Sequence, residues 1–322
     1  MTAVYTLDQI LTALAGVDPI PIIEAGFVAY SQKRVVVAPV GELIFDSPPG
    51  DLHVKSGYVL GAENAVVKIV SGFYDNVSRG LPPVSGLVIV MSQKTGVLKA
   101  VLLDNGYLTD VRTAAAGAVA ARYLAPEHPS TIGVLGAGVQ ARLQVLMLAS
   151  QCPCRNLLVW SRTDASAERY VSDMRQRGYT VERVAGPRQV VERSQLIITA
   201  TPSTTPLIEA SWIKPGTHIT AIGSDTTDKQ ELCSSALADA DIVVTDSLTQ
   251  CASRGEIFQA ASSGHLSLDR VKELGQVIMQ PSLGRTRQDQ VTIADLTGLA
   301  VQDIAIVDAV LKGLPNTDHT RH

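Results

Sequence analysis

The sequence predicts an α/β protein in which a doubly wound parallel sheet follows a smaller α+β region. Strand and helix patterns alternate from residue 131 to about residue 245, which is typical of parallel strands joined by helical crossovers. Residues 34–103 carry strand patterns without long helices between them, which indicates an antiparallel or mixed sheet. A chain of 322 residues also suits about two domains.

Composition and charge indicate an ordinary globular chain and exclude several classes of function. Hydrophobic residues make up 46% of the sequence and the net charge is −4, and no basic cluster favours nucleic acid or an anionic membrane. No leader-like segment opens the sequence, and no apolar run reaches the roughly 18 residues of a membrane span. We therefore expect a cytoplasmic protein. The four cysteines and six histidines lack metal-ligand spacing, so no metal site is expected.

The first region should contain two helices and several strands. Apolar spacing predicts helices at residues 7–15 and 19–31, packed on the strands that follow. Turn-forming stretches such as Ser47-Pro48-Pro49-Gly50 separate the strands. The predicted strands are residues 35–37, 53–60, 65–70, 86–91 and 97–103.

The second region should open with an alanine-rich helix at residues 113–124, capped by Thr109 or Asp110. The strands predicted after it are residues 131–136, 156–160, 179–184, 195–199, 217–222 and 241–244, and the helices are residues 139–150, 164–177 and 187–194. Beyond Asp246 the pattern becomes helical, and we expect a last helix at residues 299–311 to return to the first region.

Residues 131–144, T-I-G-V-L-G-A-G-V-Q-A-R-L-Q, predict a dinucleotide site. A buried strand leads into a turn with Gly136, Gly138 and Ala141, and an amphipathic helix follows. The glycines permit a sharp bend and close approach of a pyrophosphate, and the N–H groups at the helix N-terminus attract phosphate. The alternative is a glycine-rich turn that only joins a strand to a helix.

The end of the next predicted strand bears on the choice of dinucleotide. NAD-binding folds place an acidic residue there for the ribose hydroxyl, whereas an arginine accommodates the 2′-phosphate of NADP. This sequence has Ser161, Arg162 and Thr163 after Trp160, and no carboxylate. The pattern favours NADP(H) over NAD(H), and a solvated arginine in a turn is the alternative.

Lys68, Asp225 and Thr201 are the candidates for chemistry. Lys68 stands inside an apolar strand pattern, where burial of an unpaired ammonium is expensive. Strand alternation that turns Lys68 to solvent explains the pattern equally well. Asp225 follows a predicted strand, where an acid or base meets a cofactor, although such an aspartate is often a helix cap. Thr201 follows another strand and is placed to border a nicotinamide.

Several stretches resemble the ornithine cyclodeaminase/mu-crystallin family, over nearly the whole chain. They are V-K-I-V (67–70), G-L-P (80–82), L-L-D-N-G-Y-L-T-D-V-R-T-A-A-A (102–116), G-A-G-V-Q-A (136–141), I-G-S-D-T-T-D-K-Q-E-L (222–232), G-E-I (255–257) and D-L-T-G-L-A-V-Q-D (295–303). The resemblance implies a Rossmann dinucleotide-binding domain at residues 116–298. It also implies a homodimer whose α+β substrate-binding and dimerisation domain, residues 1–115, is completed by the C-terminal helix within residues 299–322.

The resemblance further implies hydride transfer between a nicotinamide and the C–N bond of a small α-amino or α-imino acid. Lys68 resembles the family's lysine that contacts the substrate carboxylate, and Asp225 resembles its acid–base carboxylate beside the reacting nitrogen. Arg112 resembles a contact to a cofactor phosphate. The positions expected to bind the cofactor are Ser85, Arg112, Thr113, Gly136, Gly138, Val139, Gln140, Ser161, Arg162, Thr163, Thr201, Ile222, Gly223 and Thr297.

One departure from the family bears on the substrate. Ornithine-specific members resemble one another in a glutamate thirteen residues before the lysine, and ungapped counting places Lys55 there. A cation in place of an anion reverses the charge preference of the pocket. With His53 on the same strand face, the pocket suits a second substrate carboxylate. Residues 41–45 hold no counterpart of the family's carboxylate-binding arginine, a role that Lys55 is expected to take.

The stretches around residues 53–58 and 71–76 are similar to the branch with ectoine-utilisation cyclodeaminase-like proteins and small imino-acid reductases. We therefore expect an NAD(P)H-dependent reductase of an anionic, iminosuccinate-like imino acid. A cyclodeaminase that releases ammonia with bound NAD, and a non-catalytic NADPH-binding protein of crystallin type, are the alternatives.

Overall fold

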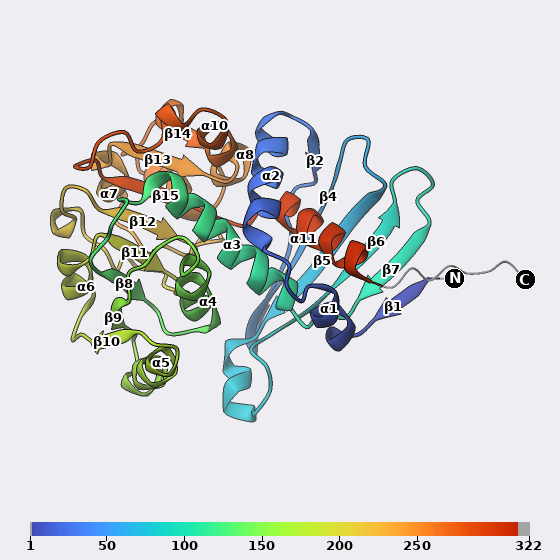
Figure 1. Cartoon of the computed structure of the whole chain (residues 1–322), viewed down its shortest axis with the longest axis horizontal. Coiled ribbons are helices and arrows are strands. Elements are labelled where there is room, and N and C mark those ends of the chain that lie inside the picture. Colours follow the sequence, from blue (N-terminus) through green and yellow to red (C-terminus); the bar gives the residue numbers. More distant parts are fainter. Residues whose placement is uncertain (1, 315–322) are drawn as a thin grey trace, which may run out of the picture. The chain divides into compact units, whose positions relative to one another are not determined.

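The computed structural model describes residues 2–314, so Met1 and residues 315–322, the two ends of the expected first domain, lie outside the described residues. The chain divides into two compact units (Figure 1): unit 1 runs up to Arg112 and resumes at Ala300, and unit 2 spans Thr113–Leu299. The helix α3 (Tyr107–Leu124) starts in unit 1 and continues into unit 2. None of the described helices is long and apolar enough to cross a bilayer.

Unit 1 is built on a seven-stranded mixed sheet. Its strands are β1 (Ala3–Tyr5), β2 (Val35–Val37), β3 (Gly41–Asp46), β4 (Pro49–Val59), β5 (Asn64–Gly72), β6 (Val84–Ser92) and β7 (Leu98–Leu102). The order is β1-β7-β6-β5-β4-β2, and β3 pairs with the first half of β4. Among the described strands of this sheet, β1 and β7 run parallel and the other pairs are antiparallel. This arrangement agrees with the mixed sheet expected for residues 34–103.

In unit 1, α1 (Leu7–Ala13) and α2 (Pro19–Ser31) pack against α11 (Ala300–Gly313), and α11 contacts β4 and β5 of the sheet. The α2 helix begins where Asp18 accepts a hydrogen bond from the N–H of Ile20 at 3.0 Å, which satisfies one free donor of the first turn. Side chains from one face of the sheet, among them Val66, Val88 and Leu102, form a common core with Val307 of α11. Strand alternation puts Lys68 on the same face as Val66, so α11 covers both.

Unit 2 contains an eight-stranded, wholly parallel sheet, which confirms the predicted α/β fold class. Its strands are β8 (Ile132–Leu135), β9 (Asn156–Trp160), β10 (Thr180–Arg183), β11 (Leu196–Thr199), β12 (His218–Ala221), β13 (Ile242–Thr245), β14 (Val271–Glu273) and β15 (Thr292–Asp295). The order is β10-β9-β8-β11-β12-β15-β13-β14. The helices that follow α3 are α4 (Val139–Leu148), α5 (Asp164–Gln176), α6 (Pro187–Arg193), α7 (Ser234–Asp239), α8 (Leu248–Cys251), α9 (Gly255–Ser262) and α10 (Leu274–Met279).

The structure corrects the sequence prediction in several places. The helix predicted to begin at residue 113 begins at Tyr107, and neither Thr109 nor Asp110 caps it, because Asp104 accepts from the N–H of Leu108 at 3.0 Å. The edge strands β1 and β3 were not predicted, because β1 is very short and β3 is exposed along its whole length. The stretch beyond Asp246 is not wholly helical: β15 lies between β12 and β13, and such short buried strands have no periodicity to reveal them.

Candidate active site

A buried cationic cluster lies on the covered face of the unit 1 sheet. Lys55 of β4 and Lys68 of β5 stand directly opposite each other in the antiparallel register. They are only 6% and 3% exposed. The alternative in which strand alternation points Lys68 to solvent is therefore wrong. Opposed side chains in such a pair lie within contact distance, so the two ammonium groups share one environment.

Asp303 is the acidic partner of this cluster, and it was not recognised as a site residue in the sequence. Its Oδ1 atom lies 3.1 Å from Lys68 Nζ and 3.0 Å from Arg112 Nε. Arg112 Nη1 also donates to Gln302 Oε1 at 2.9 Å. Asp303 and Gln302 both come from the start of α11, and Asp303 is 235 residues away from Lys68 along the chain. In the sequence, Asp303 ends the family-like stretch 295–303 and stands in the first turn of a largely apolar helix.

The balance of charge in the cluster changes the proton affinity of its members. Burial and the positive charges of Arg112 and Lys55 lower the pKa of Lys68 to about 7, and Asp303 opposes that fall only in part. Burial acts to raise the pKa of Asp303, but the charges of Lys68, Arg112 and Lys55 outweigh it and lower that pKa. Three cationic side chains thus surround one carboxylate, which is an environment that attracts a further anion.

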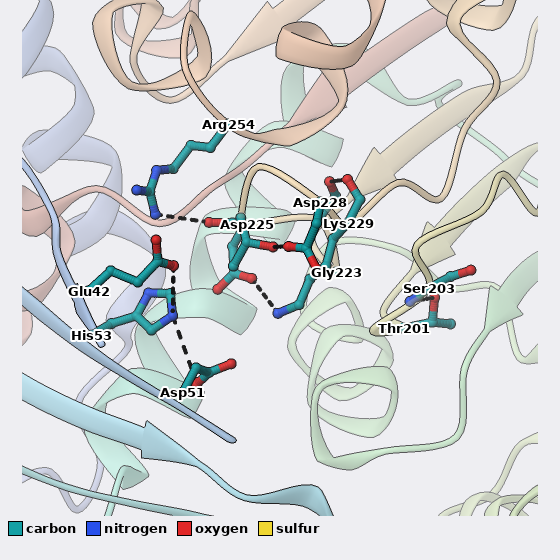
Figure 2. Close-up of polar contacts among 12 residues, drawn as sticks. Glu42, Asp51, His53, Thr201, Ser203, Gly223, Asp225, Asp228, Lys229 and Arg254 are labelled. Carbon is teal, nitrogen blue, oxygen red and sulfur yellow. Dashed lines mark hydrogen bonds and ion pairs between the residues drawn. The ribbon is translucent and has the colours of Figure 1, made fainter. Parts of the chain in front are cut away.

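His53, the other predicted substrate contact, lies on the same face of β4, two residues from Lys55. Figure 2 shows its ring between two carboxylates: Nε2 is 3.4 Å from Glu42 Oε1 on β3 and 3.8 Å from Asp51 Oδ1 on β4. The end of the sheet that holds the cationic cluster therefore also carries a small acidic group.

In unit 2, the turn after β8 has the form that a pyrophosphate requires. Gly136 has φ +113°, which side chains rarely tolerate, and a Cβ at Gly138 would meet nothing within 4 Å. Gly138 is the N-cap of α4 and supplies no side-chain cap, so the first N–H groups of the helix are not satisfied by it. Val139, in the first turn, is 54% exposed. The turn fits a dinucleotide phosphate group.

The end of β9 carries the residues predicted to select the dinucleotide. Arg162 is exposed, and no carboxylate lies between Trp160 and Thr163. Thr163 is the N-cap of α5, and its hydroxyl group donates to Ser166 at 2.9 Å. Arg162 is therefore the cation at this strand end, and a 2′-phosphate ligand for it stays a prediction.

The loop after β12 holds Asp225 in an ion pair. Lys229 Nζ lies 2.7 Å from Asp225 Oδ1, and Arg254 Nη1 donates to the Asp225 carbonyl oxygen at 3.1 Å (Figure 2). Asp225 does not cap the next helix, because the N-cap of α7 is Cys233, so the helix-cap alternative is wrong. The Lys229 ammonium stabilises the ionised form of the Asp225 side chain.

The remaining predicted contacts have varied environments. Thr201, after β11, donates its hydroxyl group to a buried glutamate at 2.7 Å. Thr297 accepts a hydrogen bond from Gln250 at 2.8 Å and is almost wholly buried.

The predicted site residues are divided between the two units. Those in unit 1 are His53, Lys55, Lys68, Ser85 and Arg112, and those in unit 2 are Thr113, Gly136, Gly138, Val139, Gln140, Ser161, Arg162, Thr163, Thr201, Ile222, Gly223, Asp225 and Thr297.

Curated proteins resemble this chain over most of its length. An uncharacterized cyclodeaminase of Sinorhizobium fredii is 42% identical, over 90% of this chain and 88% of its own. The alanine dehydrogenase of Archaeoglobus fulgidus is 34% identical, over 96% of this chain and 94% of its own. The iminosuccinate reductase of Paracoccus denitrificans is 32% identical, over 90% of this chain and 89% of its own.

Solved structures resemble the whole fold as well. An archaeal alanine dehydrogenase dimer with bound NAD matches with a TM-score of 0.88 and 31% identity, over 97% of this chain and 95% of its own. The iminosuccinate reductase of Paracoccus denitrificans in complex with NAD⁺ matches with a TM-score of 0.83 and 28% identity, over 97% of this chain and 96% of its own. The model of the ornithine cyclodeaminase/mu-crystallin family matches residues 2–316. The chain therefore belongs to the ornithine cyclodeaminase/mu-crystallin family.

Proposed function

We propose that this protein is an NAD(P)-dependent oxidoreductase that reduces a small anionic α-imino acid, of the iminosuccinate type, to the amino acid. The single observation that carries the proposal is the buried cluster of Lys55, Lys68 and Arg112 around one carboxylate. A substrate with two carboxylates supplies the negative charge that this cluster attracts. The terminal ammonium of a diamino acid would instead meet three positive charges.

In this proposal Lys68 binds the α-carboxylate, since it is the lysine that the family resemblance assigns to that group. Lys55, directly opposite, binds the second carboxylate. Asp303 holds Lys68 and Arg112 at fixed positions, which lowers the entropic cost of ordering them around the ligand. The pairing of both cations with one carboxylate oxygen thus prepares the site for an anion.

The glycine turn Gly136–Gly138, Val139 and Arg162 would hold the cofactor, and a bound nicotinamide supplies hydride to the α-carbon. Asp225 acts at the nitrogen. Because Lys229 favours its ionised form, Asp225 accepts a hydrogen bond from the protonated imine nitrogen and keeps the proton there. A protonated imine takes up hydride more readily than a neutral one, so the charge on Asp225 promotes reduction.

The test is reductive amination with purified protein. Oxaloacetate with ammonia and NAD(P)H should give aspartate, with one nicotinamide oxidised for each amino acid formed. Pyruvate with ammonia, which lacks the second carboxylate, should react with a kcat/KM lower by about tenfold or more, the effect of one lost charged contact. Equal rates with the two oxo acids would contradict the assignment of Lys55.

A second candidate is a cyclodeaminase, and one observation favours it. Glu42 and Asp51 lie beside His53, and these carboxylates would attract the terminal ammonium of a diamino acid. Such an enzyme recycles its cofactor, so ornithine would be converted to proline and ammonia with only catalytic NAD. That result, without net oxidation of NAD(P)H by any imine, would replace the reductase proposal with this one.

We also infer that the protein works as a homodimer. The edge strand β3 exposes Leu43 and Phe45 on one face and Ile44 on the other, and an exposed apolar edge strand favours association with another chain. Sedimentation equilibrium should give twice the chain mass of 34.1 kDa. A monomer that reduces imines at full rate would contradict the inference.

A further inference from the structure

No role described above uses the side chain of Glu231, although both oxygens of its carboxylate accept hydrogen bonds near the predicted cofactor contacts. Glu231 lies in unit 2 between β12 and α7 and is 0% exposed. Burial of a carboxylate is costly unless hydrogen-bond donors satisfy both of its oxygens. The donors that satisfy this one come from two separate loops.

Four hydrogen bonds reach the Glu231 carboxylate. Oε1 accepts from the N–H and the hydroxyl group of Thr201, both at 2.7 Å. Oε2 accepts from the hydroxyl group of Thr199 at 2.7 Å and from the N–H of Gly223 at 2.9 Å. Thr199 ends β11 and Gly223 follows β12, and the two strands are parallel neighbours. One side chain therefore links the loops at the carboxyl ends of two adjacent strands.

The same loops also pack closely on each other and on the glycine turn. A Cβ at Gly136 would lie 2.6 Å from the carbonyl oxygen of Ala200, so the turn after β8 touches the loop after β11. A Cβ at Gly223 would lie 2.5 Å from Glu231 Oε2. The carboxyl ends of β8, β11 and β12 thus form one packed set. Because Gly223 has no side chain, the Glu231 carboxylate can approach its backbone closely.

A second buried carboxylate holds the backbone of Glu231 in place. Glu256 accepts from the N–H of Glu231 at 2.7 Å and from the N–H of Leu232 at 3.1 Å. Burial raises the pKa of Glu231 to about 7 and that of Glu256 well above its usual range. Burial of a polar side chain costs free energy that an apolar side chain of the same size would not cost. The presence of Glu231 and Glu256 at this position favours a role in geometry over a role in stability.

We propose that Glu231 is the positioning residue for the nicotinamide end of the cofactor site. A dinucleotide lies across the strands where the order of the sheet reverses, here with its adenosine half toward β8 and β9 and its nicotinamide half toward β11 and β12. Glu231 links the ends of β11 and β12 and thereby fixes the positions of Thr201, Ile222 and Gly223, which are expected to contact the cofactor. The inference rests on the proposed function only for its assumption that a nicotinamide dinucleotide binds.

The test is Glu231→Gln, because an amide cannot make these contacts. Each oxygen of Glu231 accepts from one backbone N–H, of Thr201 on one side and Gly223 on the other. Whichever way the amide is placed, its NH₂ group meets a backbone donor that cannot rotate. Loss of one such bond should raise the Kd for NADH by about tenfold and alter the fluorescence of bound NADH. The Kd for ADP-ribose, which lacks the nicotinamide, should stay within about twofold.

Two further variants keep the test decisive. Glu273→Gln is the matched control: Glu273 is a buried glutamate of the same sheet, on the edge strand β14 and separated from β12 by β15 and β13, so neither Kd should change. If Glu231→Gln does not fold, Thr199→Val removes one of the four hydrogen bonds without changing charge and should give the same selective effect, only smaller. A merely structural role would lower the melting temperature and weaken both ligands equally, and that result overturns the proposal.

The outcome is separable from that of the proposed function. If the wild-type protein binds NADH but reduces no imino acid, the reductase proposal is wrong. The inference about Glu231 is then still tested by the Kd values for NADH and ADP-ribose. An active reductase whose Glu231→Gln variant keeps its wild-type affinity for both NADH and ADP-ribose would end this inference alone.

Discussion

Lys55 and Lys68 stand opposite each other across the β4–β5 pair, and both are buried. Two like charges in that position destabilise the ligand-free fold unless an anion balances them. Asp303 balances part of the charge. A substrate carboxylate would balance more of it, and this relationship leads to the first three predictions.

Lys55→Glu should reverse the charge preference of the site. The kcat/KM for iminosuccinate should fall by about 10²-fold, because a carboxylate of the substrate would then face a carboxylate of the protein. The new acid would lie opposite Lys68 and pair with it, so the variant should fold. Lys99→Glu, at an exposed lysine of β7 in the same sheet, is the control and should leave the rate unchanged. An equal fall of kcat/KM in both variants would show that Lys55 has no specific role in binding the substrate.

The pH profile of kcat/KM should fall above about pH 7. Lys68 binds a carboxylate only in its charged form, and burial together with Arg112 lowers its pKa to about 7 in the free protein, the state that kcat/KM reports. Steady-state rates between pH 6 and pH 9 test this. Lys68→Arg stays charged throughout that range, so its profile should lack the decline even if its rate is lower. A decline that persists in Lys68→Arg belongs to another group.

Lys68 should also make stability depend on pH. Its pKa is about 7 in the folded protein and 10.5 for a lysine exposed to water, so between those values the unfolded chain binds more protons. Stability from this group therefore rises with pH across that window, by at most about 1.4 kcal/mol per unit. Urea unfolding at pH 7, 8 and 9 should show this slope in the wild type and a smaller slope in Lys68→Met. Identical slopes would mean that Lys68 is not buried in charged surroundings.

Asp225→Asn should lower kcat by a factor of about 10²–10⁴, the usual range for a lost acid or base, and leave the Kd for NAD(P)H unchanged. The amide keeps the shape of the side chain but loses the charge that holds a proton on the imine nitrogen. Asp228→Asn, in the same loop, is the control and should keep most activity. Loss of cofactor binding in Asp225→Asn would show that the residue has been misassigned.

Arg162→Ser should weaken NADPH binding by roughly 10–100-fold and change NADH binding little, because a charge-assisted bond to the 2′-phosphate would be lost. The control is Arg169→Ser, because Arg169 is also exposed but lies within α5, seven residues after Arg162. Isothermal titration with both nucleotides measures the ratio. If the two nucleotides lose affinity equally, Arg162 does not select between them.

Much of the architecture was predictable because its signals are local. The bounds of α2 and β9 agree with the prediction, since a proline-led apolar helix and a five-residue buried strand carry their own patterns. β15 was not predicted, because four buried residues between two parallel neighbours depend on those neighbours for their conformation. The start of α3 was misplaced by six residues because Asp104, outside the alanine-rich stretch, supplies the cap.

By itself, the sequence determined the chemistry of the turn at Gly136 and Gly138, since steric freedom at a glycine is a property of the residue. It also determined which residue types stand at positions 55, 68 and 225. Only the tertiary structure decided that Lys68 is buried and shares Asp303 with Arg112, and that Glu231 links two strand ends. The energy of a charge depends on the solvent it loses and the partners it gains. Here those partners come from chain segments far apart in sequence, which only folding brings together.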